Sequence, residues 1–147
     1  MAVAIAGCFT LGTAQAGTIN WGPAKSATIN SPYGGVVIGA PDDSTGGFMF
    51  SKGQMTKFGS DADMIIGNNG IIGATGIALS KKGFKSTSEL DRGNYLDVLR
   101  IKNEGDLFVI LLRNGKHAKI RIDKLTPGEA WFTYSKITFS YRIEKRG

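Results

Sequence analysis

The length, composition and charge of the chain confine it to a single globular domain. Its 147 residues are hardly enough for two domains but can bury a core without disulfides or metal, and the 41% of hydrophobic residues excludes a disordered chain. The 21 glycines indicate many turns, and the formal net charge of +6 lies mainly in the half that begins at Phe84.

The first sixteen residues predict an export signal. They carry no charge, contain an apolar run and end in Ala14-Gln15-Ala16, the small-x-small pattern of a cleavage site. Because basic residues are missing ahead of the apolar run, we expect the natural start to lie upstream. We therefore divide the chain into a signal peptide, 1–16, and one β-rich domain, 17–147. The apolar run is too short for a transmembrane helix, which needs about 20 residues.

Cys8 opens other interpretations of the same segment. Ile5-Ala6-Gly7-Cys8 resembles the lipobox of bacterial lipoproteins, in which Cys8 carries lipid and holds the domain at a membrane. Alternatively, 1–16 form a strand or helix of the mature fold. If the segment is removed, the remaining 131 residues contain no cysteine, which excludes disulfides, thiolate metal sites and thiol catalysis. We expect a secreted or cell-surface protein, with a periplasmic or lipid-anchored location as the alternative.

The middle of the chain alternates short strands with turns. The predicted strands cover 48–50, 54–58, 63–66, 70–79 and 95–102. The first two form a hairpin around Ser51-Lys52-Gly53, and Asn68-Asn69-Gly70 separates the next two. Because glycines interrupt the stretch 70–79, we expect turns to break it.

The clearest hairpin signal lies over 107–123. Asn114-Gly115 joins two β-rich runs there, and both residues tolerate the positive φ of a type I′ turn. The second strand alternates with period two, so its apolar side chains share one face and its polar side chains the other. The apolar face is predicted to be buried and the polar face exposed: Ala118, Ile120 and Ile122 against His117, Lys119, Arg121 and Asp123.

The final strand repeats this alternation and completes the fold class. The apolar side chains from Ile137 to Ile143 are predicted to point inward, after a connection at Thr126-Pro127-Gly128. No helical pattern is longer than a turn, and the capping box at Ser86–Glu89 is followed at once by turn residues. We predict an all-β chain: a single antiparallel β-sandwich or barrel-like domain with at most one or two short helical turns.

Three segments together resemble a β domain common in secreted bacterial proteins. They are Gly47-Phe-Met-Phe-Ser-Lys-Gly53, Ala62-Asp-Met-Ile-Ile66 and Leu107–Ile122, the last resembling that family's Y-V-V-K-T-R-D-G-K-Y-A-K-I-R-I hairpin. Met49 stands where the family usually has Asp, and His117 where it has Tyr. The C-terminal hairpin is also similar to that of haem-scavenging lipoproteins of anaerobic bacteria, which hold haem between two axial histidines. The resemblance implies a β-rich fold and export, but the haem function does not carry over because this chain has one histidine.

His117 is the only residue that could serve as the base of a Ser-His-Asp site. It is predicted to lie exposed among positive charges, which lower its basicity. We therefore predict no catalytic residue and no enzyme activity. A His/Met haem site through His117 and Met49, Met55 or Met64 is one alternative, against the interpretation that these methionines fill gaps in the core.

The pair Asp61 and Asp63 is the candidate metal site. Calcium takes several oxygen ligands, which loops supply well. The pair lacks the terminal Glu of an EF-hand, and an inward Asp63 that caps a turn is an equal alternative. We expect no cofactor, with haem or calcium as alternatives.

The candidate binding site is a set of six side chains on adjoining strands, here called the basic face: Lys116, His117, Lys119, Arg121, Lys136 and Arg142. An exposed basic face attracts acidic polymers through long-range fields. Four aromatic residues are candidate sugar-stacking platforms: Trp21, Tyr33, Trp131 and Tyr134. The alternative is that the aromatic residues build the core and the charges solvate a sheet face.

These features predict a non-enzymatic exported or cell-surface β domain that acts through protein or polymer contacts. Its expected partner is an extracellular protein or an acidic polymer and not nucleic acid. The alternative is a ligand-binding module for haem or acidic glycan, and an enzyme is the third interpretation.

Overall fold

The computed structural model describes residues 20–30, 47–56, 61–80, 83–84, 95–129 and 133–145. The predicted signal peptide, the capping box at 86–89, Tyr33 and Trp131 lie outside these residues. The described part of the chain contains ten strands and no helix: β1 (Asn20–Trp21), β2 (Lys25–Asn30), β3 (Gly47–Met49), β4 (Gln54–Thr56), β5 (Met64–Ile66), β6 (Ile71–Leu79), β7 (Leu96–Arg100), β8 (Leu107–Leu111), β9 (His117–Pro127) and β10 (Tyr134–Lys145).

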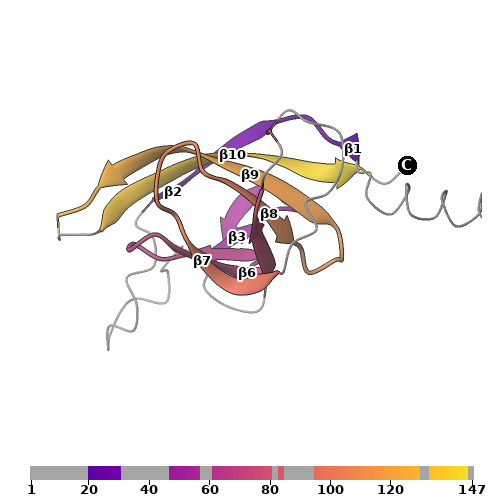
Figure 1. Ribbon diagram of the computed structural model, residues 1–147, viewed down its shortest axis with the longest axis horizontal. Coiled ribbons are helices and arrows are strands. Elements are labelled where there is room, and N and C mark those ends of the chain that lie inside the picture. Colours follow the sequence, from indigo (N-terminus) through magenta and orange to yellow (C-terminus); the bar gives the residue numbers. More distant parts are fainter. Residues whose placement is uncertain are drawn as a thin grey trace, which may run out of the picture.

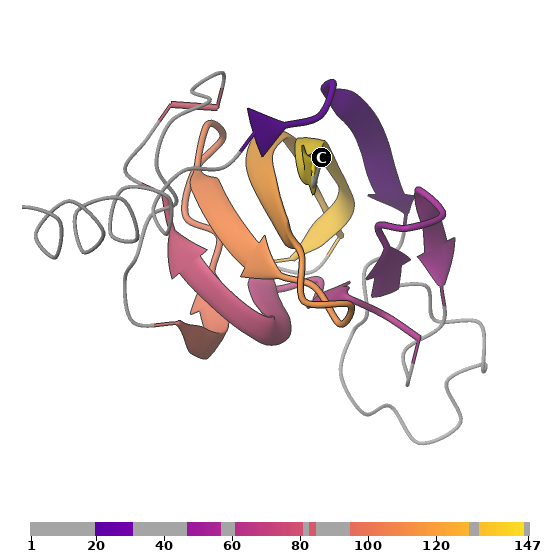
Figure 2. The same cartoon turned by 90° about the vertical axis from the view of Figure 1, so that its right-hand side faces the viewer.

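All of these strands belong to one antiparallel sheet that curls into a half-barrel (Figure 1). The hydrogen-bonded order is β1-β10-β9-β8-β6-β5-β3-β4, with β2 also paired to β10 and β7 to β6. Ile77 pairs with both Ile110 of β8 and Leu96 of β7, so these two strands lie on opposite edges of β6. Figure 2 shows the strands curving round a common interior. The predicted all-β class is confirmed.

The interior of the half-barrel is filled by the alternating side chains of β9 and β10. Ala118, Ile120 and Ile122 on β9 are fully buried, and so are Ile137 and Phe139 on β10, as predicted. Burying large apolar side chains stabilises a fold by about 1.5 to 3 kcal/mol each. The long β9–β10 ladder therefore supplies much of the core.

The predicted hairpins are confirmed, and one predicted break is wrong. Phe48 of β3 pairs with Met55 of β4, and Leu111 of β8 pairs with His117 of β9. The stretch 71–79 is a single strand, because neighbouring strands pair with it on both edges. Its glycines bring other backbones close: a Cβ on Gly73 would lie 3.5 Å from the carbonyl oxygen of Asp97 in β7.

The turn between β8 and β9 is not the predicted type I′ turn. The Gly115 N–H donates to the Leu112 carbonyl at 3.0 Å, and the Leu112 N–H donates to the Lys116 carbonyl at 2.8 Å. This pattern defines a three-residue loop in which Gly115, at φ 85°, takes the left-handed bulge position. The Asn114 side chain accepts the Lys116 N–H at 2.9 Å, which favours this longer loop over the two-residue one.

The turn between β5 and β6 has the same hydrogen bonds one hairpin away. The Gly70 N–H donates to the Gly67 carbonyl at 3.0 Å, and the Gly67 N–H donates to the Ile71 carbonyl at 2.8 Å. The Asn69 side chain accepts the Ile71 N–H at 3.1 Å. Gly70, at φ 83°, is the bulge residue here. In both turns the Asn side chain accepts a backbone N–H and the following Gly takes the left-handed bulge position.

Tyr141 gives the fold an alkaline limit. Its ring lies among Phe48, Phe50 and Phe139, and this burial raises the pKa of its hydroxyl above the ordinary value of 10.0. The folded state then keeps a proton that the unfolded chain has lost, so this contribution to stability is complete below about pH 10 and is lost as the pH rises through the folded-state pKa. We expect the free energy of unfolding to fall more steeply above about pH 10 in the wild type than in Tyr141→Phe, as measured by urea denaturation across this range. Equal pH slopes would contradict the burial of this hydroxyl.

Candidate functional site

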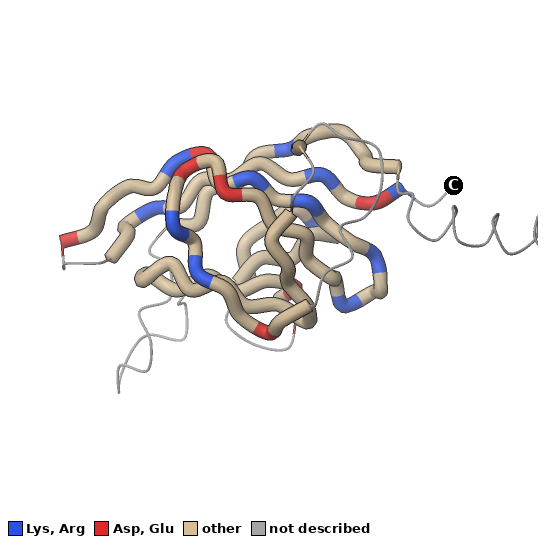
Figure 3. The backbone as a smooth tube through the Cα atoms, in the orientation of Figure 1, with Lys and Arg blue, Asp and Glu red and all other residues tan. Residues whose placement is uncertain are grey.

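The basic face is not a single exposed surface. Figure 3 shows the Lys and Arg positions distributed over several strands and turns. Of the six predicted members, Lys136 is exposed, Lys119 is buried with 1% of its surface exposed, and the others are partly buried: Lys116, His117, Arg121 and Arg142. The predicted exposure of Lys119 is wrong. Alternation places these side chains on the outer face of the sheet, and other parts of the chain cover that face.

Lys119 is covered by the first strand and by Gly83. Its Nζ donates to the Gly83 carbonyl at 3.1 Å and lies 5.0 Å from the centroid of the Trp21 ring. A cation over an aromatic face replaces part of the hydration that burial removes. Trp21 is itself only 5% exposed, so it is a packing partner of Lys119 and does not offer its ring to a sugar. Tyr134 packs against the core.

His117 has an acidic neighbour and not the positive surroundings predicted for it. Its Nδ1 lies 3.3 Å from Oε1 of Glu144, and its backbone N–H donates to the same oxygen at 3.0 Å. Its side chain is 17% exposed. Three methionines were considered with it for haem. Met64 is fully buried in the core and Met55 packs against the core, whereas Met49 lines a pocket beside Asp63. These positions favour the gap-filling interpretation for Met64 and Met55.

Two members of the basic face meet at one pocket. Arg121 of β9 and Arg142 of β10 line a pocket of about 440 Å³ together with Ala24 and Phe84, and we call it the arginine pocket. The β9–β10 register pairs Arg121 with Ser140 and Arg142 with Lys119, so the two arginines occupy neighbouring outward positions. Ala24 belongs to the connection between β1 and β2, and Phe84 follows the end of β6.

Arg142 is held by backbone carbonyls. Its Nε donates to Gly22 at 2.8 Å, Nη1 to Phe84 at 3.2 Å and Nη2 to Trp21 at 3.4 Å. These carbonyls fix the guanidinium plane and join β10 to β1 and to the Phe84 segment. Among the described residues, no carboxylate forms an ion pair with Arg142.

The Arg121 guanidinium forms an ion pair with the Asp123 carboxylate. Its Nε donates to Oδ1 of Asp123 at 2.7 Å, and its Nη2 donates to the Ser140 hydroxyl at 3.4 Å. The Ser140 hydroxyl in turn donates to the other Asp123 oxygen. The guanidinium carbon lies 4.6 Å from the centroid of the Phe84 ring. The Arg121 guanidinium is therefore held by hydrogen bonds at its edge and by the Phe84 ring on its face.

The surroundings of the arginine pocket hold more donors than acceptors. Within the described ranges Arg142 bonds to three carbonyls and to no carboxylate, and the Lys119 ammonium lies over the ring of Trp21, the residue that supplies one of these carbonyls. The arrangement suits an acceptor-rich, negatively charged ligand.

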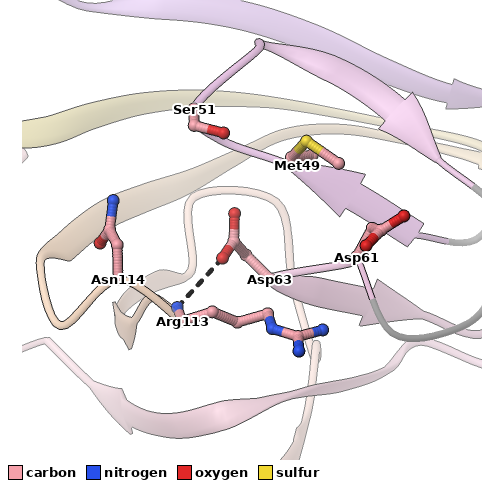
Figure 4. Close-up of a pocket in the computed structure, with 6 residues that line it drawn as sticks. All are labelled: Met49, Ser51, Asp61, Asp63, Arg113 and Asn114. Atoms are coloured by element: carbon pink, nitrogen blue, oxygen red, sulfur yellow. Dashed lines mark hydrogen bonds between the residues drawn. The ribbon is translucent and has the colours of Figure 1, made fainter.

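Asp61 and Asp63 lie at a second pocket, which we call the Asp63 pocket (Figure 4). It has a volume of about 280 Å³ and is lined by Met49, Ser51, Asp61, Asp63, Arg113 and Asn114. Figure 4 shows Asp63 between the turn that carries Ser51 and the turn that carries Arg113. Its Oδ2 accepts the Phe50 N–H at 2.9 Å and its Oδ1 accepts the Arg113 N–H at 3.1 Å.

This geometry favours the turn-capping interpretation of Asp63. Both carboxylate oxygens are bonded to backbone amides, and Asp63 is 8% exposed whereas Asp61 is exposed. Across the described ranges, no three His, Cys, Asp or Glu side chains gather as a metal site. Asp63 connects the β3–β4 hairpin to the β8–β9 hairpin.

Sequence reasoning missed Phe84 and Ala24, which complete the arginine pocket. Neither residue lies in a periodic run, and neither belongs to a strand. The only available signal was the pair of outward arginines at Arg121 and Arg142, and it did not show which side chains would face them.

Comparison with known proteins gives a likeness of fold. No family model and no curated protein sequence matches the chain. The crystal structure of the apo HmuY analogue (TFO) from Tannerella forsythia is similar, with a TM-score of 0.57 and 12% sequence identity, over 87% of this chain and 99% of that chain. None of the described residues belongs to a helix that is long and apolar enough to cross a membrane. The resemblance expected from the C-terminal hairpin is thereby confirmed as a likeness of fold.

Proposed function

We propose that this chain is a non-enzymatic domain of the cell exterior that binds an acidic polymer through the arginine pocket. The observation that carries the proposal is the guanidinium of Arg142, which is oriented by three backbone carbonyls while no described carboxylate pairs with it. The predicted export signal at 1–16 supports a location outside the cell.

The distribution of charge supports binding in two stages. The net charge of +6 attracts an acidic polymer over long range, and this attraction weakens with salt. The arginine pocket then provides short, oriented contacts to single acidic groups. Charge-assisted hydrogen bonds of this kind contribute about 1.5 to 3 kcal/mol each. Exposed Lys136 contributes to the first stage and, because it does not line the pocket, not to the second.

The proposal is tested by binding of the full chain to immobilised polygalacturonate, with dextran as the neutral control. We expect saturable binding to polygalacturonate that weakens as the sodium chloride concentration rises, and no binding to dextran. Fractionation of the producing cells should recover the chain outside the cytoplasm. Equal binding to both polymers, or binding to neither, would overturn the proposal.

A haem titration distinguishes the proposed function from the alternative interpretation, a haem-binding module. Haem is added to the chain and to His117→Ala, and the Soret absorption is followed. We expect no His117-dependent change in this band. A band that shifts with the wild type and not with His117→Ala would support a haem module and contradict the proposed function.

A further inference from the structure

The chain contains the dipeptide Asn-Gly at two places, Asn69-Gly70 and Asn114-Gly115, and both lie in turns of the same type. In each turn the Asn side chain accepts the backbone N–H two residues further on, and the Gly N–H donates to the carbonyl three residues back at 3.0 Å. Both glycines have positive φ. Because the dipeptide and its local bonds are the same, a difference in the chemistry of the two asparagines must come from their surroundings.

An asparagine that precedes a glycine loses its side-chain amide without an enzyme when the backbone allows it. The glycine nitrogen gives its proton to hydroxide and attacks Cγ of the asparagine. The N–Cγ bond forms, the Cγ–Nδ2 bond breaks, and ammonia leaves after taking a proton from water, which gives a cyclic succinimide. Water then breaks either bond between the ring nitrogen and a carbonyl carbon, and the product is aspartate or isoaspartate. Glycine favours the attack because it has no Cβ to block the approach of its nitrogen.

The surroundings of Gly70 oppose this reaction. Gly70 is buried, and a Cβ on it would lie 3.2 Å from Cε2 of Tyr134 and 3.3 Å from the carbonyl oxygen of Ile101. Its carbonyl accepts the Ile101 N–H at 2.8 Å, and the Asn68 carbonyl accepts the Tyr134 N–H at 2.7 Å. Ring closure requires the peptide group between Asn69 and Gly70 to rotate, so that its nitrogen reaches the Asn69 side chain. The packing and both bonds resist this rotation, so the reaction requires this part of the sheet to open first.

The surroundings of Gly115 leave room for the same rotation. Asn114 and Gly115 are both exposed, and a Cβ on Gly115 would meet nothing within 4 Å. Figure 4 shows Asn114 on the β8–β9 turn. The bond from the Arg113 N–H to Asp63 belongs to a peptide group nearer the start of the loop, not to the group that rotates. Gly115 therefore has steric room to move when its bond to Leu112 opens, and exposed turns open far more readily than a buried strand end.

We propose that Asn114 is a site of spontaneous deamidation in the folded protein, and that packing around Gly70 protects Asn69 from the same reaction. The only co-reactant is water, with hydroxide as the base. The proposal is independent of the proposed function, because none of the residues that line the arginine pocket takes part.

The modification changes the charge of the Asp63 pocket. Asn114 lines this pocket, whose lining residues include two carboxylates and one guanidinium, so deamidation adds a third carboxylate. Aspartate at position 114 keeps an oxygen that accepts the Lys116 N–H. Isoaspartate adds a carbon to the main chain and so lengthens the loop that the bond between Leu112 and Lys116 closes. We therefore expect the isoaspartyl product to be less stable than the aspartyl product.

The experiment follows the full chain at mildly alkaline pH, folded in one sample and unfolded in urea in the other. Peptic digestion at acidic pH, where succinimide forms slowly, and mass spectrometry then measure the acid formed at each asparagine. We expect Asn114 to react at least about tenfold faster than Asn69 in the folded chain, because two hydrogen bonds and buried packing hold only the turn at Gly70 to other parts of the sheet. In urea the two rates should agree within about twofold, because the fold no longer distinguishes them. Labelling by an isoaspartyl methyltransferase identifies the isoaspartate that only the succinimide route produces.

Gly115→Ala separates the chemistry from the mobility of the turn. The new Cβ strains the turn and makes it open more often, yet it blocks the attacking nitrogen, so the reaction of Asn114 should slow at least about tenfold. Circular dichroism confirms that this variant is folded. An unchanged rate in folded Gly115→Ala would contradict the attack by the Gly115 nitrogen.

The comparison of the two asparagines decides the proposal. Equal rates in the folded chain overturn it, and so does the absence of product at Asn114 in the folded chain while both asparagines react in urea. A rate at Asn69 that stays about tenfold below that of Asn114 in urea also overturns it, because the protection would then come from the local sequence and not from the packing of Gly70.

Discussion

Asp63→Ala is expected to lower the free energy of unfolding by about 2 to 5 kcal/mol, the cost of leaving one buried and one part-buried amide donor without acceptors. The substitution removes both oxygens that bond to the Phe50 and Arg113 N–H groups, and so frees the β3–β4 hairpin from the β8–β9 hairpin. Urea denaturation followed by circular dichroism measures the loss. Asp61→Ala is the matched control, because Asp61 is exposed and its removal should stay within about 0.5 kcal/mol.

Two further measurements distinguish this structural role from a metal site. Asp63→Asn keeps one acceptor oxygen but places an amide donor opposite a backbone donor, so its stability should fall between those of the wild type and Asp63→Ala. Calcium or a chelator should leave the unfolding midpoint of the wild type unchanged. A midpoint that rises with calcium in the wild type and not in Asp63→Asn would show instead that Asp61 and Asp63 bind metal.

Gly70→Ala is expected to cost about 2 to 4 kcal/mol, well above the roughly 1 kcal/mol expected for Gly115→Ala. The two glycines occupy the left-handed bulge position of two turns of the same type, at φ 83° and 85°. The backbone strain of adding a Cβ is therefore common to both. A Cβ on Gly115 would meet nothing within 4 Å, whereas one on Gly70 would lie 3.2 Å from Cε2 of Tyr134 and 3.3 Å from the carbonyl oxygen of Ile101.

The surroundings of Gly70 leave little room for relief. The Ile101 N–H donates to the Gly70 carbonyl at 2.8 Å, and the Tyr134 N–H donates to the Asn68 carbonyl at 2.7 Å. The turn is thus bonded to two other parts of the chain that a new methyl group would push away. The same denaturation experiment compares the two variants, and equal losses would contradict the packing at Gly70.

Among the strands that were predicted from the sequence, β10 shows local alternation most clearly. Every second residue of β10 from Ile137 to Tyr141 faces a full core, so period two appears directly in the residue types. β2 was not predicted. It reads Lys-Ser-Ala-Thr-Ile-Asn, and Ile29 is its only fully buried residue, so its place in the sheet comes from pairing with β10 and not from its own composition.

The candidate site was only partly predictable because the residues that cover the outer face of the sheet come from distant parts of the chain. Period two correctly assigned Lys119 and Arg121 to the outer face of β9. It carried no information that Trp21 and Gly83 would cover Lys119, or that Phe84 would stack on Arg121. The turn at Asn114-Gly115 failed for a related reason: Asn-Gly is compatible with two loop lengths, and the pairing of Leu111 with His117 decides between them.

The pairing of β1 and β2 with β10 sets the order of events during folding. Thr28 meets Thr138 across a sequence separation of 110 residues, and contacts between such distant segments form slowly because a long loop must close first. A chain still emerging from the ribosome therefore holds its first strands without their partner until β10 has been synthesised. The arginine pocket needs Ala24 from the first segment and Arg142 from the last, so it comes into being only when the sheet closes. The ligand recognition proposed for this pocket would thus be available only to completely folded molecules, and a bound ligand would in turn hold the two ends of the chain together.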